Sequence, residues 1–314
     1  MTRLDPLVAR ARNLVAPHVR DGAVVAVSGG ADSLVLAAAV AFFVQRRGLR
    51  ARAVVVDHGL QPGSAAVAAR AAGQCDALGL PAVVRAVEVL DHGTGPEDAA
   101  RRARHAALRD EAGDGPVLLA HTLDDQAETV LLGLGRGSGP RSIQAMAPVA
   151  GPLRRPFLSL RRTETERICA VHGLDWWDDP HNTDPRFRRV RVRTELLPLM
   201  EDVLGGGVAE ALARTADLVR ADADVLDALA LRAHPAAVED VEAVAALDRA
   251  VRLRVWRRLA LDAGARAGEL THAHLQSLDA LTTAPGGTTI QLPGHVVAVR
   301  EGGAVRFAAR EAGR

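Results

Sequence analysis

The chain has 314 residues and a mass of 33.0 kDa, which is enough for a large core and a second domain. Hydrophobic residues make up 48% and charged residues 25%, with a formal net charge of +1, so net charge alone does not indicate a polyanionic partner. No stretch approaches the roughly 20 apolar residues of a membrane helix and no signal-peptide core precedes the first motif, so we expect a cytoplasmic protein with no membrane partner.

Strand-like and helix-like stretches alternate in the first half of the chain. An amphipathic helical pattern within residues 3–20 precedes four apolar runs of strand length, at 23–27, 51–56, 82–87 and 116–120. Helical stretches separate these runs, at 33–46, 64–78 and 97–112. The alternation predicts an α/β fold with a doubly wound, Rossmann-like parallel sheet. Ligands of such sheets bind beyond the carboxyl ends of the strands, so the residues after each run are candidates for the site.

The second half changes in character from about residue 152, where arginine pairs become frequent. A long helical pattern covers 207–232, and two helices (247–262 and 271–283) precede strands around 288–292 and 295–308. We therefore expect a catalytic domain at 1–200, a helical linker at 201–235, and a small α+β substrate-binding domain at 236–314.

The stretch SGGADS (28–33) follows the first strand and has the composition of a phosphate cradle. Gly29 and Gly30 allow the backbone to approach an anion, and the helix that follows contributes its positive end. The chain contains no lysine, so this grip differs from a Walker A loop. Asp32 fits an anion site if Mg²⁺ bridges it to phosphate. A glycine-rich turn with an Asp or Ser helix cap is the simpler alternative.

Polar residues also follow the second and fourth strands. Asp57 and His58 follow the second strand directly, although His58 can equally be an ordinary loop histidine. The stretch HTLDDQAE (121–128) places four ionisable groups at the end of the fourth strand: His121, Asp124, Asp125 and Glu128. The preference of acidic residues for helix N-termini accounts for one of them, but not for the whole group.

Four motifs resemble those of the tRNA(Ile)-lysidine synthetases, a family of N-type ATP pyrophosphatases of the PP-loop superfamily. They are SGGADS, VDHGL (56–60), AHTLDDQAETVLLGLGRGSG (120–139) and DDPHNTDPRFRRVRVRTELLP (178–198). A weaker resemblance covers LPGHVVAVREGGAVRF (292–307), and the chain has the length of the shorter form of the family.

The resemblance implies a ligase that uses ATP and Mg²⁺. Such an enzyme adenylates the first anticodon cytidine of an isoleucine tRNA with a CAU anticodon, and free L-lysine then displaces AMP to form lysidine. Members of the family are often drawn as homodimers, and the resemblance extends this expectation to the chain.

The resemblance also assigns roles to individual residues. The expected catalytic residues are Asp32, His121, Asp124 and Asp125. Those expected to bind ATP are Ser28, Gly29, Gly30, Ala31, Asp32, Ser33, Asp57, His58, Arg101, Arg104 and Arg136. Lysine is expected at Asp124, Asp125 and Glu128, and the metal at Asp32 and Asp125. The expected tRNA contacts are Arg186, Arg188, Arg189, Arg191 and Arg193. Charge runs are usually solvated faces, and a helix face with solvated arginines is the alternative for Arg101 and Arg104.

The chain departs from the family pattern at three places. It has SIQAM at 142–146 where a Gly-Leu/Ile-x-Gly-Met segment is common, Val190 after Arg189 where the family has asparagine, and His105 where it has tyrosine. These departures concern contacts with tRNA more than the chemistry of ATP.

Other enzymes and proteins share the ATP loop. A tRNA thiolase usually uses a Cys-x-x-Cys pair for its sulfur chemistry, and Cys75 and Cys169 do not form such a pair. An amidotransferase-type synthetase would need an ammonia source, and no nucleophilic cysteine segment is visible. A nucleotide-gated RNA-binding protein without catalysis would show degenerate loops, whereas SGGADS and HTLDDQAE are intact.

Overall fold

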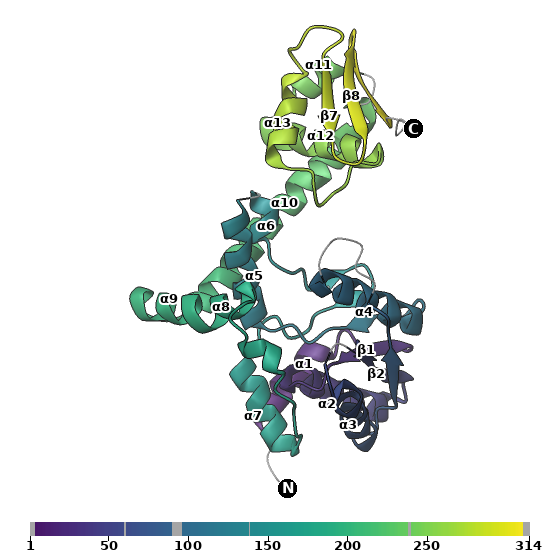
Figure 1. The fold of residues 1–314 in the computed structure, drawn as a ribbon, viewed down its shortest axis with the longest axis vertical. Helices are drawn as coiled ribbons and strands as arrows, with labels where there is room; N and C mark the ends of the chain where they lie inside the picture. Colours follow the sequence, from purple (N-terminus) through teal and green to yellow (C-terminus); the bar gives the residue numbers. More distant parts are fainter. Residues whose placement is uncertain (1–3, 60, 90–95, 138, 238–239, 310–314) are drawn as a thin grey trace. The chain divides into compact units, whose positions relative to one another are not determined.

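The computed structural model describes residues 4–59, 61–89, 96–137, 139–237 and 240–309 and divides the chain into two compact units (Figure 1). The first unit comprises Met1–Leu132 and Ala145–Ala213, and the second comprises Gly133–Gln144 and Arg214–Arg314. Helices α5 (Leu123–Arg136) and α10 (Val208–Ala237) run through the boundaries between the units. The division at residues 200 and 235 that the sequence suggests stays a prediction.

The first unit is built on a six-stranded sheet with the strand order β3-β2-β1-β4-β6-β5. Its strands are β1 (Ala23–Val27), β2 (Ala51–Asp57), β3 (Ala82–Ala86), β4 (Val117–Leu118), β5 (Val149–Ala150) and β6 (Leu153–Arg154). All neighbouring pairs are parallel except β5 and β6, which form an antiparallel edge. The strand order changes direction between β1 and β4, so the crevice beyond their carboxyl ends is the expected ligand site.

Helices cover both faces of this sheet, which confirms the predicted doubly wound fold. Val25 and Val27 of β1 belong to the apolar core shared with α1 (Pro6–Val15), α2 (Ala31–Arg47), α3 (Ser64–Ala77) and α7 (Arg162–His172). Val24, which points to the other face, packs in a cluster with Leu108 of α4 (Pro96–Ala112). Figure 1 shows α4 and the pair α2 and α3 on opposite sides of β1 and β2.

The part of the first unit that follows β6 is helical. It contains α7, a 3₁₀ turn η1 (Pro180–Thr183), α8 (Arg188–Arg191), a π-helical segment η2 (Val192–Leu196) and α9 (Leu197–Leu204). The sequence patterns predict none of these helices, because the arginine pairs interrupt the apolar periodicity. Helix α7 packs against α2, and this contact brings the residues around 162 to the phosphate loop.

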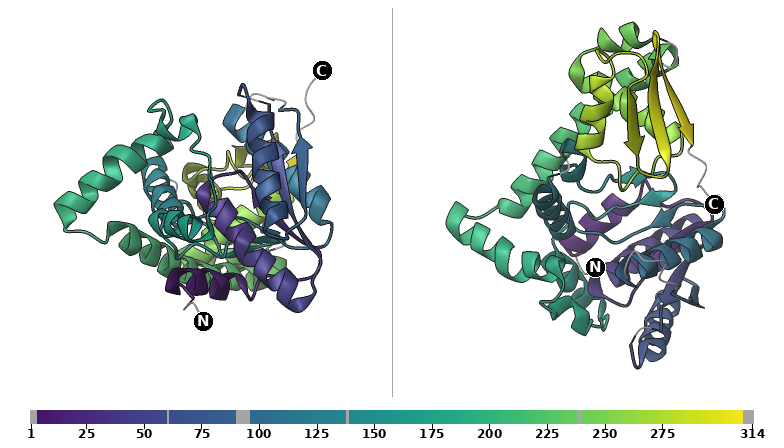
Figure 2. Two further views of the ribbon diagram at one scale, coloured as in Figure 1. Left: turned by 90° about the horizontal axis from the view of Figure 1, so that it is seen from below. Right: turned by 45° about the horizontal axis from the view of Figure 1, so that its top comes forward.

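The second unit joins short helices to an antiparallel three-stranded sheet. Its elements after α6 (Pro140–Ile143) and α10 are α11 (Val241–Ala245), α12 (Arg249–Asp262), α13 (His272–Ala280), β7 (Thr289–Leu292), β8 (Val296–Glu301) and β9 (Ala304–Ala309). The core gathers around the fully buried Trp256 of α12, together with Leu278, Leu281 and Val296. The right-hand view of Figure 2 shows the three strands side by side (yellow) next to the helices (green). This unit has the small α+β architecture predicted for the C-terminal part.

Among the residues that the structure describes, no helix combines the length and apolar character that crossing a bilayer requires.

Candidate functional site

The phosphate loop lies between β1 and α2. Gly29 has φ +87°, a left-handed conformation that side chains rarely adopt, and an added Cβ would approach Ala71 at 3.4 Å. The Ser33 hydroxyl donates to the carbonyl oxygen of Gly30 at 2.8 Å and accepts from the backbone N–H of Ser28 at 3.2 Å, which fixes the turn. The first N–H groups of α2 lack intrahelical acceptors, so the loop is built to receive an anion.

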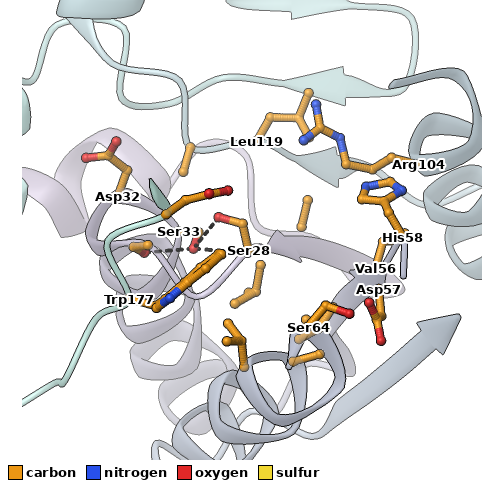
Figure 3. Close-up of a pocket in the computed structure, with 18 of the residues that line it drawn as sticks. Ser28, Asp32, Ser33, Val56, Asp57, His58, Ser64, Arg104, Leu119 and Trp177 are labelled. Atoms are coloured by element: carbon orange, nitrogen blue, oxygen red, sulfur yellow. Dashed lines mark hydrogen bonds between the residues drawn. The ribbon is translucent and has the colours of Figure 1, made fainter. Parts of the chain in front are cut away.

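A pocket of about 510 Å³ opens in front of this loop at the carboxyl ends of β1, β2 and β4 (Figure 3). Of the residues expected to bind ATP, it is lined by Ser28, Gly30, Asp32, Ser33, Asp57, His58 and Arg104. In Figure 3, Asp32 lies on one side of the pocket and Arg104 and His58 on the opposite side. The indole of Trp177 lies beside Ser28, and its backbone N–H donates to the carbonyl oxygen of Gly29 at 3.0 Å.

The side of the pocket near α4 carries positive charge without counter-charge; we call Arg101, Arg104, His105 and Arg155 the basic cluster. No carboxylate among the described residues pairs with its three arginines. The Nε atoms of Arg104 and Arg155 are buried without a hydrogen-bond partner in the described part of the chain. Burial and the neighbouring Arg101 lower the pKa of both guanidinium groups. Buried, positively charged N–H groups that lack a hydrogen-bond acceptor indicate a site for an anion.

Three histidines lie in or beside the basic cluster, and the positive charge of the cluster contributes to lowering the pKa of each. Burial and then Arg104 lower the pKa of His58, and burial lowers that of His121 to about 4, with Arg155 and Arg104 adding to the effect against Asp125. Burial and then Arg104 likewise lower the pKa of His105 to about 4. The Nδ1 atoms of His58 and His121 are also buried without a partner in the described chain. These imidazoles are therefore neutral near pH 7, and His121 is free to accept a proton.

The opposite side holds Asp32, Asp124, Asp125 and Glu128 together with Arg161, Arg162, Arg189 and Arg193; we call these eight residues the acidic cluster. Asp125 closes the start of α5, since its Oδ2 accepts from the backbone N–H and hydroxyl of Thr122 at 2.8 and 3.1 Å. Its Oδ1 lies 3.3 Å from Nη2 of Arg162, whose Nε lies 3.6 Å from Oδ2 of Asp32. Asp32 also accepts from the Thr165 hydroxyl.

Asp124 and Glu128 lie behind Asp125 and do not line the pocket. Glu128 is 0% exposed, and its two carboxylate oxygens accept from Nε of Arg189 at 2.8 Å and Nε of Arg193 at 2.7 Å. Asp124 accepts from the Arg161 side chain at 3.1 Å and from the backbone N–H of Arg162 at 2.8 Å. Of the three carboxylates expected to hold lysine, Asp125 is the one that reaches the pocket.

Asp32 and Asp125 are suited to a divalent cation. Burial raises the pKa of Asp32 to about 6, against the opposing effects of Thr165 and Arg162. Arg162 and His121 keep the pKa of Asp125 below its usual range despite its burial. The two carboxylates already share one cationic group, that of Arg162, and phosphate oxygens would complete the oxygen ligands that Mg²⁺ prefers. Among the described residues no group of three His, Cys, Asp or Glu side chains is arranged to hold a metal ion.

The arginines expected to contact tRNA do not form one patch. Arg189 and Arg193 turn inward to Glu128, Arg186 pairs with Asp184 at 2.6 Å, and Arg191 pairs with Glu195 at 2.8 Å. Arg188 is exposed and has no ion-pair partner in the described chain. Val190, the departure from the family pattern, is buried in α8. Arg136, expected to bind ATP, belongs to the second unit and is exposed at the end of α5.

Sequence reasoning missed Arg155, Arg162 and Thr165. Arg155 follows β6 directly at the carboxyl edge of the sheet, so the rule that selected Asp57 and His121 would have found it had β6 been recognised. Arg162 and Thr165 lie more than 100 residues from Asp32, and no spacing connects them. The sequence offers Trp176 and Trp177 as base-stacking residues, with core packing as the alternative; in the structure Trp176 packs on the core and Trp177 lines the pocket.

Comparisons with known proteins agree with this geometry. The PP-loop domain family matches residues 4–200. A tRNA(Ile)-lysidine synthase of Leifsonia xyli subsp. xyli is 51% identical, covering 93% of this chain and 92% of that protein. A tRNA(Ile)-lysidine synthase of Thermobifida fusca is 48% identical, covering 94% and 95%. A solved structure, the U34-tRNA thiolase NcsA from Methanococcus maripaludis with its 4Fe–4S cluster, superposes with a TM-score of 0.54 at 15% identity, over 68% of this chain and 80% of that one. That likeness shows the shared fold alone.

The doubly wound sheet, the SGGADS loop and the matched domain define an ATP-binding enzyme of the PP-loop class. Within that class, the chain belongs to the tRNA(Ile)-lysidine synthase family and is a ligase that modifies tRNA.

Proposed function

We propose that the chain converts the first anticodon cytidine of tRNA(Ile) with a CAU anticodon to lysidine, using ATP and free L-lysine and releasing AMP and pyrophosphate. The observation that carries this proposal is the division of the pocket. An anion loop and an uncompensated basic cluster face carboxylates that suit a cationic substrate. The two relatives at 51% and 48% identity support the choice of tRNA(Ile).

In the first step, the phosphate loop would hold the β- and γ-phosphates and Arg104 would stabilise negative charge on the α-phosphate. The ring carbonyl oxygen of cytidine attacks the α-phosphorus, and pyrophosphate leaves. Asp57 and His58, at the end of β2, would contact the adenosine. Asp32 and Asp125 would hold Mg²⁺, which supplies charge neutralisation for the phosphates when bound.

In the second step, the lysine ε-amine attacks the activated ring carbon and AMP leaves. Asp125 would orient the ammonium group, with Asp124 and Glu128 reinforcing the negative potential from behind. Neutral His121 is placed to take the proton that the amine gives up. Phosphate bound at the basic cluster would offset the repulsion from Arg155 and Arg104 and raise the pKa of His121, making it a stronger base.

The tRNA would lie along the exposed part of the 186–193 segment, led by Arg188, and on the second unit. Trp177 is placed to stack on a base at the pocket. An enzyme that consumes ATP, lysine and tRNA would work in the cytoplasm. The homodimer expected from the family stays a prediction.

A thiolase reaction on this fold is disfavoured by the cysteines. Cys75 and Cys169 are both buried and free, and burial raises the pKa of each thiol to about 12. Neither thiol would ionise to a sulfur nucleophile near pH 7.

The test is incorporation of radiolabelled lysine into unmodified tRNA(Ile) with a CAU anticodon, in the presence of Mg-ATP, against a tRNA(Met) control. We expect label in tRNA(Ile) alone. Pyrophosphate release with a different tRNA and no lysine incorporation would overturn the proposal while retaining the ATP site.

A further inference from the structure

One arginine of the acidic cluster is held differently from the other three. Arg189 and Arg193 contact Glu128 at 2.8 and 2.7 Å, and Arg161 contacts Asp124 at 3.0 Å. Arg162 instead lies between three carboxylates, at 3.3 Å from Asp125, 3.6 Å from Asp32 and 4.0 Å from Glu128. Three of the pairs in the cluster are short, whereas Arg162 makes several long contacts.

The backbone of Arg162 is fixed although its side chain is loosely held. Its N–H donates to Asp124 at 2.8 Å, at the first residue of α7. The side chain is 25% exposed and lines the pocket. It can therefore turn away toward solvent without disturbing the start of the helix.

The charge balance explains why a guanidinium lies there. The cluster has four carboxylates and four arginines, and Arg161 also pairs with Glu210 at 2.7 Å, so each carboxylate of the cluster lies beside at least one guanidinium. Without Arg162, the nearest cation of the cluster would be Arg193, 3.9 Å from Asp125, so keeping both Asp32 and Asp125 ionised in this poorly solvated site would be costly. A divalent cation at the same two carboxylates would meet strong repulsion from a guanidinium left in place.

We propose that Arg162 is a stand-in cation, which occupies Asp32 and Asp125 in the ligand-free chain and releases both when a divalent cation binds. This rests on the proposed function, which assigns the metal to these two carboxylates. Arg162 is thus a positioning residue: it keeps the carboxylates ionised and ordered until the metal arrives, at the cost of metal affinity.

The proposal makes a prediction that a purely structural arginine would not satisfy. Removing the charge of a structural residue would weaken metal binding or leave it unchanged. Removing the charge of a competing cation strengthens metal binding, here by about tenfold or more for a unit charge within 4 Å at a partly exposed site.

The experiment measures binding of Mn²⁺ alone to the full chain, free of nucleotide and tRNA, by electron paramagnetic resonance of the free ion. The variants are Arg162→Met, which keeps the length of the side chain without its charge, and Arg162→Lys, which keeps a charge. Arg167→Met is the matched control, because Arg167 is exposed on the same helix. We expect Arg162→Met to bind Mn²⁺ about tenfold tighter than the wild type, with Arg162→Lys and Arg167→Met within about twofold of it. Equal or weaker binding by Arg162→Met overturns the proposal.

A second measurement uses the wild-type chain and does not depend on how a variant folds. Phenylglyoxal modifies accessible guanidinium groups, and peptide mass spectrometry measures the extent at each arginine. Saturating Mn²⁺ should raise the modification of Arg162 severalfold and leave that of Arg167 unchanged. No rise at Arg162 contradicts the proposal. Neither measurement involves tRNA or lysine, so either can fail while lysidine formation succeeds, and the reverse holds as well.

Discussion

The two sides of the pocket treat charge in opposite ways. The basic cluster leaves Arg101, Arg104 and Arg155 without a carboxylate partner in the described chain, and two of their Nε atoms are buried and unpaired. In the acidic cluster each of the four carboxylates has an arginine partner, and Arg161 also pairs with Glu210. A buried charge without a counter-charge is neutralised when a ligand of opposite charge binds. A buried charge that already has a side-chain partner can bind a ligand only if the ligand displaces that partner. We therefore expect that an anion bound at the basic cluster stabilises the folded chain directly. A cation bound at the acidic cluster must instead replace an arginine side chain that already neutralises the carboxylates.

The largest effect should come from Asp32, which lies between the phosphate loop and the acidic cluster. Asp32→Ala removes a proposed metal ligand, and we expect pyrophosphate release with tRNA(Ile) to fall about 10³-fold. Binding of tRNA, measured by filter retention, should stay within about twofold because Asp32 lies inside the pocket. Asp175→Ala, on the surface, is the control. Undiminished pyrophosphate release would remove Asp32 from the site.

The basic cluster is tested by Arg104→Met. If Arg104 holds a phosphate of ATP, its loss should raise the KM for ATP by about 10- to 100-fold, the usual worth of a hydrogen bond to a charged group. Arg109→Met, exposed on the same helix, should leave KM unchanged. A weakened affinity for tRNA with an unchanged KM for ATP would assign this side of the pocket to RNA phosphate instead.

The acidic cluster is tested by Asp125→Asn, which keeps the hydrogen-bond acceptor for Thr122 and removes the charge. We expect the KM for lysine to rise about tenfold, because the ammonium group loses its ionic partner in the pocket. Steady-state lysine incorporation measures it, with the surface variant Glu195→Gln as control. A change confined to the KM for ATP would place the lysine pocket elsewhere.

The smallest effect concerns His105 and pH. The folded chain binds a proton at His105 only near pH 4, whereas the unfolded chain does so near the ordinary pKa of 6.5. The unfolded state therefore holds more protons between these values, and stability falls as pH drops from about 6.5 to 4. His105→Gln should lose less stability over this range than the wild type, by about 1 kcal/mol after discounting for solvent screening. Urea unfolding at several pH values decides it, and parallel curves for the two proteins would show that His105 does not sense the cluster.

The sequence predicts the two clusters unequally, for physical reasons. SGGADS and HTLDDQAE can be recognised in the sequence because the residues of each motif are contiguous and each motif follows a predicted strand. The sequence groups Glu128 with these residues, but its burial under Arg189 and Arg193 depends on a π-helical segment that no periodicity predicts. The arginine run at 186–193 shows where positive charge lies in the sequence but not which side chains point inward. Arg189 and Arg193, which turn toward Glu128, therefore cannot be told from the exposed Arg188 by sequence alone. Arg162 and Arg155 reach the site only through the packing of α7 and the short strand β6.

The most direct test of the two-sided account is pyrophosphate release in a single turnover with tRNA(Ile) and Mg-ATP but no lysine, using the wild type and Asp125→Asn. The account predicts a burst of about one pyrophosphate per tRNA from both proteins, slower in Asp125→Asn because this variant has lost one proposed metal ligand, with lysine incorporation impaired beyond that slowing. A burst that requires lysine, or lysine incorporation by Asp125→Asn that is slowed no more than its burst, would contradict the assignment of phosphate and amine to opposite sides of one pocket.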